Sequence, residues 1–139
     1  AYPASKTFSI IGSAASTSGT TVTISSLTSS PFLIAVFAGV SHNGGGSNNI
    51  QVAVSDDGSV FDTAIGVGTA TAAANVLYGF AVIFRTSETA TAKIITSGGP
   101  NQTFGGLQSS ETGVTVALQF SWSAGASFDA GNIYVYGFS

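Results

Sequence analysis

The side chains that could do chemistry are few, and the first group is three carboxylates within seven residues. Asp56, Asp57 and Asp62 follow an alternating stretch, and carboxylate oxygens bind hard cations such as calcium. Their spacing differs from that of an EF-hand loop, and aspartate in a turn commonly bonds its own backbone. A glycosidase would need two carboxyl groups facing each other across a cleft, whereas adjacent residues at a hairpin tip point apart. We therefore expect a turn here, with neither a metal site nor a glycosidase pair.

His42 is the one histidine, and it precedes the glycine run Gly44-Gly45-Gly46. A catalytic triad would place it near an activated serine and an acid, but the sequence contains no Gly-x-Ser-x-Gly elbow. The glycine run is not a phosphate cradle, since no lysine or helix follows it. With no cysteine in the chain, thiol catalysis and most structural zinc sites are excluded. We predict a solvated loop histidine, no catalytic residues and no cofactor.

Aromatic side chains are the remaining candidates, because their faces can stack on sugars or pack against another subunit. Trp122 falls on the apolar face of an alternating stretch, which indicates a core position. Tyr134 and Tyr136 share one face of the last alternating stretch, and Phe104 and Leu107 stand in an irregular stretch where exposure is expected. These last four are the predicted subunit or ligand contacts.

The element that displays these patterns best is a hairpin over 49–67. Ile50, Val52 and Val54 alternate with smaller or polar residues, which is the period of a strand with one buried face. Asp56 to Ser59 supplies turn chemistry, including a glycine that can take positive φ. Thr63 to Val67 then predicts the returning strand.

The rest of the chain repeats this style. Further strands are expected over 7–12, 20–27, 32–40, 76–85, 90–96, 113–123 and 132–138. The strands over 32–40 and 76–85 are apolar on both faces, which fits either a strand covered on both sides or one whose second face meets another subunit. With eight or nine strands and no amphipathic helix, the sequence predicts one domain over 1–139, an all-β antiparallel sandwich of the jelly-roll kind. Residues 1–6 are expected to form an extended arm, and 97–112 an irregular stretch.

Composition narrows the class of partner. Only 6% of the 139 residues are charged, against about 25% in ordinary domains, yet 44% are hydrophobic and the mean hydropathy is +0.42. A net charge of −3 with three scattered bases cannot neutralise a phosphate backbone, so no nucleic-acid partner is expected. No apolar run reaches the length of a membrane span. Proteins with so few charges repel one another weakly, which is typical of proteins inside assemblies or outside cells.

Two stretches carry a resemblance to known proteins. One runs from the apolar strand ending at Gly39-Val40 to Ser55-Asp-Asp-Gly-Ser-Val-Phe-Asp62, and the other is Phe128-Asp-Ala-Gly-Asn-Ile-Tyr-Val-Tyr-Gly137. Together they cover about a third of the chain. In this order and separation they resemble the small jelly-roll virion proteins of tailed bacteriophages. Ser59 departs from the pattern, since relatives often carry a second glycine or an extra residue there.

The resemblance implies a non-enzymatic structural protein of a phage particle, made in the bacterial cytoplasm and located in the virion. A capsid decoration (cement) protein that binds the shell of major capsid protein fits a chain of this size. The alternatives are a tail-fibre or receptor-binding tip and a carbohydrate-binding sandwich module. From the apolar strands we also predict self-association into a closed ring such as a trimer, because closed symmetry hides an apolar patch in every copy.

Overall fold

A computed structural model describes residues 7–27, 30–70, 72–73, 75–84, 92–98, 104–107 and 114–138, with the backbone alone at 65, 68–70, 92–98 and 104–107. The described residues form ten strands and no helix. The strands are β1 (Phe8–Ala15), β2 (Thr21–Ile24), β3 (Phe32–His42), β4 (Asn48–Ser55), β5 (Ile65–Ala70), β6 (Leu77–Phe84), β7 (Ala92–Gly98), β8 (Phe104–Leu107), β9 (Ala117–Trp122) and β10 (Phe128–Phe138).

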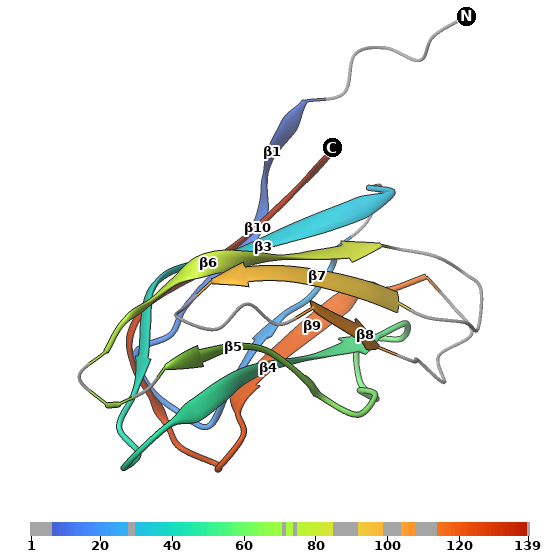
Figure 1. Cartoon of the computed structure of the whole chain (residues 1–139). Helices are drawn as coiled ribbons and strands as arrows, with labels where there is room; N and C mark the ends of the chain where they lie inside the picture. Colours follow the sequence, from blue (N-terminus) through green and yellow to red (C-terminus); the bar gives the residue numbers. More distant parts are fainter. Residues whose placement is uncertain are drawn as a thin grey trace, which may run out of the picture.

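The strands form two antiparallel sheets packed face to face (Figure 1). One sheet has the order β1-β10-β3-β6-β7-β8 and the other the order β2-β9-β4-β5. Four nested pairs generate this order: β1 with β10, β2 with β9, β3 with β6 and β4 with β5. A nested ribbon of eight strands folded into two four-stranded sheets is a jelly roll, so the predicted fold class is confirmed. The hairpin of β7 and β8 extends the first sheet beyond β6.

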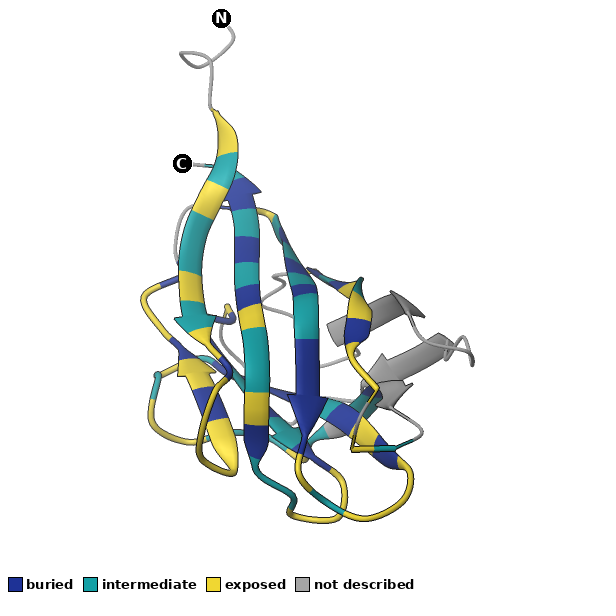
Figure 2. Ribbon diagram, turned by 90° about the vertical axis from the view of Figure 1, so that its left-hand side faces the viewer, coloured by how far each residue is buried: buried dark blue, intermediate teal, exposed yellow. Residues whose placement is uncertain are grey.

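The core lies between the two sheets and is built from alternate residues of each strand. Its largest fully buried side chains are those of Trp122, Phe37, Phe120 and Phe128. On β9 the predicted inner face is confirmed from Leu118 to Trp122, whereas Val114 precedes the strand and is exposed. Figure 2 shows the same alternation of buried and more exposed residues along β10.

Several strand boundaries differ from those expected. The 49–67 hairpin is confirmed as β4 and β5, although its second strand starts at Ile65 and runs on to Ala70. β1 continues to Ala15, past the expected end at Gly12, because a bulge between Ile10 and Gly12 lets the pairing with β10 resume. Within the stretch expected to be irregular, β7 runs to Gly98 and β8 forms over 104–107. The arm at 1–6 lies outside the described residues.

β3 shows how the six-stranded sheet is covered. Leu33, Ala35 and Phe37 point into the core, and the intervening residues point away from it and are half-buried. No layer of described residues packs on this second side. The interpretation of β3 as a strand covered on both sides by its own chain is therefore wrong for the described ranges, because a two-layer sandwich gives each strand one inner face. Contact with another subunit remains a prediction.

Candidate functional site

The side of the six-stranded sheet that points away from the core is apolar over four strands, and we call it the outer face. Its residues stand in register across the sheet, as in the row Tyr136, Ile34, Val82 and the row Tyr134, Val36, Phe80. The outer face consists of Phe8, Ile10, Ser13 and Ala15 of β1, Asn132, Tyr134, Tyr136 and Phe138 of β10, Phe32, Ile34, Val36 and Ala38 of β3, and Tyr78, Phe80, Val82 and Phe84 of β6. Its polar exceptions are Ser13, the exposed amide of Asn132 and the tyrosine hydroxyl groups. None of these side chains carries a charge.

One end of the outer face is an aromatic cluster, where β1 begins and β10 ends. Phe8 stacks on Tyr136 with ring centroids 5.9 Å apart and lies 5.2 Å from Phe138. Phe32 lies 5.8 Å from Phe138, edge to face, and 6.5 Å from Phe84. We call these five residues the terminal aromatic cluster. Its outermost members, Phe8 and Phe84, remain 42% and 44% exposed, so the cluster presents rings to solvent.

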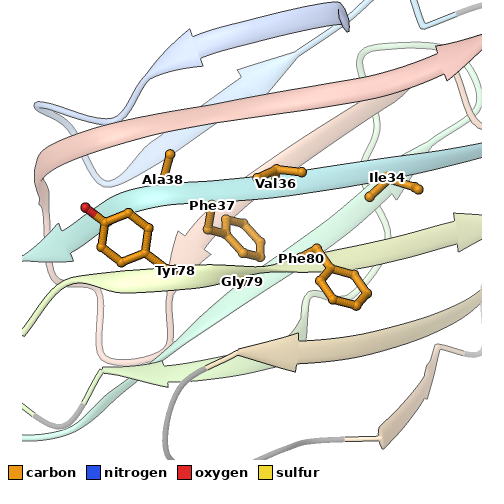
Figure 3. Close-up of a pocket in the computed structure, with 7 residues that line it drawn as sticks. All are labelled: Ile34, Val36, Phe37, Ala38, Tyr78, Gly79 and Phe80. Carbon is orange, nitrogen blue, oxygen red and sulfur yellow. The ribbon is translucent and has the colours of Figure 1, made fainter. Parts of the chain in front are cut away.

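Next to the terminal aromatic cluster, from Ile34 to Ala38, the outer face is hollowed between β3 and β6. A groove of about 490 Å³ opens between the Tyr78 and Phe80 side chains (Figure 3). We call it the Tyr78–Phe80 groove, and its lining residues are Ile34, Val36, Phe37, Ala38, Tyr78, Gly79 and Phe80. Tyr78 is 67% exposed, and its hydroxyl group lies over Gly39, where an added Cβ would be 3.2 Å from that oxygen. Apart from this hydroxyl, the lining side chains are apolar.

The structure places the predicted contact residues in different settings. Tyr134 and Tyr136 share one face of β10, as their alternation predicted, and that face is the outer face beside β3. Phe104 and Leu107 begin and end β8, at the edge of the same sheet opposite to β1, and their side chains lie outside the described part. Trp122 is in the core, as predicted. Sequence reasoning missed Phe8, whose role depends on its pairing with Phe138 across the sheet.

His42 contradicts its prediction as a solvated loop residue. It is the last residue of β3, pairs with Phe128, and is completely buried. Its Nδ1 accepts a hydrogen bond from the Gly44 amide at 3.2 Å and lies 3.4 Å from the Asn48 amide nitrogen. The strand continues to His42 because its pairing with β10 resumes beyond the bulges at that end of the sheet. This environment fixes the imidazole as a structural element.

The aspartate turn has the role that its sequence predicted. The Asp57 carboxylate accepts hydrogen bonds from the Ser59 amide (2.7 Å), the Val60 amide (2.8 Å) and the Ser55 hydroxyl (3.0 Å). These bonds favour the ionised form, the two backbone donors most, and lower the pKa of Asp57 to about 2. Within the described ranges, no three His, Asp or Glu side chains are grouped so that they could share a metal ion.

Comparisons with family models, curated proteins and solved structures find no match to this chain. None of the described residues belongs to a helix of the length and hydropathy needed to cross a membrane. Among the described residues, the outer face is the best candidate for a binding surface, because it is apolar and partly exposed.

Proposed function

We propose that the chain is a non-enzymatic structural protein of a bacteriophage particle, a capsid decoration protein whose copies associate through the outer face. The observation that carries the proposal is the outer face itself, which is continuous, aromatic and free of charge. Contiguous apolar surface of this extent is uncommon on soluble monomers and usually marks an interface. Each large side chain buried there would contribute on the order of 1.5–3 kcal/mol if it were fully removed from water.

Two further observations support a role inside an assembly. With 6% charged residues, neighbouring copies repel one another weakly. The stretches Ser55–Asp62 and Phe128–Gly137 resemble phage virion proteins, and they form a tight turn and the strand beside β3. The major capsid protein is the partner that this resemblance implies, and a place on the tail is the alternative within the same class.

A carbohydrate-binding module is the alternative from another class, and the arrangement of aromatic residues disfavours it. Trp122, the strongest candidate for stacking on a sugar, is buried in the core. The exposed rings of the outer face stand among aliphatic side chains such as Ile34 and Val82, whereas sugar recognition needs polar groups that fix hydroxyl positions.

Light scattering over a range of protein concentrations tests self-association. We expect a multimer, and we expect Tyr136→Asp to lower its mass with the fold intact, because the change puts a charge into the outer face. Val60→Asp is the matched control, since Val60 is exposed and lies outside the outer face. A strict monomer that binds immobilised glycans would overturn the proposal.

Cosedimentation with capsid shells of the phage that encodes the chain tests the proposed location, and failure to bind them would redirect the proposal to the tail.

A further inference from the structure

Resting on the proposed self-association, we infer that the Tyr78–Phe80 groove is filled by the terminal aromatic cluster of a second copy. The two copies pack outer face to outer face around a twofold axis. This assigns an occupant to the groove and a partner to the exposed rings, and it favours a pair of copies over the threefold ring considered from the sequence.

The outer face carries both a projecting part and a receiving part. Phe32 and Phe84 pair with each other at one end of β3 and β6, and Ala38 and Tyr78 pair with each other at the groove. The two levels are six residues apart along each strand, or about 20 Å at the rise of a β-strand. The groove is in the size range of pockets that hold organic ligands, roughly 300–1,000 Å³, so it can take aromatic side chains.

Twofold symmetry brings the two parts together. A twofold axis that lies in the interface and runs across the strands reverses the strand direction while keeping the order of strands. β6 of one copy then faces β6 of the other, and the level of Phe84 faces the level of Tyr78. The same operation places Phe32 and Phe84 of each copy over the groove of the other, while Phe8 and Phe138 face the level of Ala15 and Asn132 on β1 and β10. Both contacts therefore form together, as an isologous interface requires.

The accessible area of the outer face is comparable with that of a stable interface. Its five most exposed apolar residues, Phe8, Ile10, Tyr78, Phe80 and Phe84, are between 41% and 67% exposed, which at roughly 150–250 Å² for each side chain leaves on the order of 400–600 Å² of accessible surface. The half-buried residues of the face add to this area, and a stable protein–protein interface buries about 800 Å² on each partner. No charged side chain of the face has to be desolvated in forming it.

Other kinds of ligand would cover less of the outer face or make fewer favourable contacts with it. An acyl chain or a small hydrophobic molecule would fill the groove and leave Phe8 and Phe84 in water. A glycan would meet few hydrogen-bonding groups, since the lining offers the Tyr78 hydroxyl alone among its side chains and the exposed amide of Asn132 lies beside it on β10. A second copy covers the groove and the cluster at once.

The experiment changes each part separately and then combines them. Ala38→Phe fills the groove from its floor while keeping the surface apolar, and the double change Phe8→Ser with Phe84→Ser removes the outermost rings of the cluster. We expect each variant to weaken self-association at least about tenfold, the effect of losing an interface hot spot. Val60→Phe adds similar apolar area outside the outer face and is expected to leave association unchanged. Urea unfolding of each variant verifies that its fold is retained.

Mixing the two weakened variants provides the decisive measurement. The cluster of the groove-filled copy can still enter the open groove of the copy without outer rings, so the mixture should form mixed pairs at concentrations where each variant alone is monomeric. Association of Ala38→Phe as strong as that of the native chain, or a mixture no stronger than its components, would overturn the inference while leaving the proposed multimer standing. A native chain that is monomeric at every concentration would defeat both. Saturable binding of octyl glucoside to a native monomer, lost in Ala38→Phe, would assign the groove to a small ligand instead.

Discussion

The imidazole ring of His42 lies 4.8 Å from the indole ring of Trp122, and both side chains are buried between the two sheets. His42 thus links the aromatic core to a hydrogen-bonded group of residues, which we call the His42 corner and which comprises His42, Gly44, Asn48 and Ala124. Gly44 and Asn48 place donor groups at Nδ1, and Asn48 in turn accepts a hydrogen bond from the Ala124 amide at 3.2 Å. This corner ties the loop after β3 to the turn after β9.

His42→Ala should destabilise the protein by about 2–4 kcal/mol, because it leaves a cavity against Trp122 and two donor groups without their acceptor. Urea unfolding followed by the fluorescence of the single tryptophan measures this free energy. Val60→Ala is the control at an exposed site and should change the free energy of unfolding by less than about 0.5 kcal/mol. A His42→Ala value in that same range would show that the corner does not depend on the imidazole.

Gly131→Ala should be more destabilising than Gly125→Ala, although both glycines have positive φ. A Cβ on Gly131 would lie 2.5 Å from the carbonyl of Gly39, where β10 bulges against β3, whereas at Gly125 it would meet open space. Gly125→Ala thus carries only the left-handed strain of about 1–2 kcal/mol, and Gly131→Ala adds a clash with backbone. Thermal unfolding of the two variants compares them, and equal midpoints would contradict this close approach of the strands.

Asp57→Asn should remove a pH-dependent part of the stability. The folded-state pKa of Asp57 is about 2 against an ordinary value of 3.8, so its contribution is present above about pH 4 and is lost as the pH falls towards 2. The difference in denaturation midpoint between the native chain and Asp57→Asn should therefore shrink over that range. Asp56→Asn makes the same change in net charge one residue earlier and is the matched control. A difference that stays constant down to pH 2 would contradict the assignment.

Self-association should respond weakly to sodium chloride, because the outer face carries no charge to be screened. The dissociation constant is expected to change by less than about threefold between about 0.05 and 0.5 M NaCl, and to fall in ammonium sulfate, which strengthens apolar burial. Sedimentation equilibrium at each salt concentration measures it. A steep weakening in NaCl would move the contact to a charged part of the surface.

The alternation of side chains was sufficient to predict which residues share a face. It placed Leu118, Phe120 and Trp122 inward on β9, and it put Tyr134 and Tyr136 together on β10. These predictions succeed because a strand has a period of two whatever its partners are. They also led to two residues of the candidate site before any pairing was known.

Features set by distant pairing could not be read from local pattern. Phe8 joins the aromatic cluster because it stands opposite Phe138, and nothing near Phe8 in the sequence indicates that neighbour. His42 precedes a glycine-rich loop and therefore resembled a loop residue, yet its pairing with Phe128 extends β3 and buries it. β8 contains Gly105 and Gly106, which disfavour a strand, and it forms by pairing with β7.

The position of β10 between β1 and β3 has a consequence for how the protein is made. β10 is the last described strand to leave the ribosome, yet it occupies a slot between two strands from the first third of the chain. Until β10 is made, the edges of β1 and β3 that it occupies have no strand to pair with, and the sheet is incomplete. Long-range pairing of this kind folds slowly, on a scale of roughly milliseconds to seconds, and open edges invite aggregation. A chain truncated before Phe128 should therefore be recovered mainly in the insoluble fraction, because the slot between β1 and β3 is then never filled.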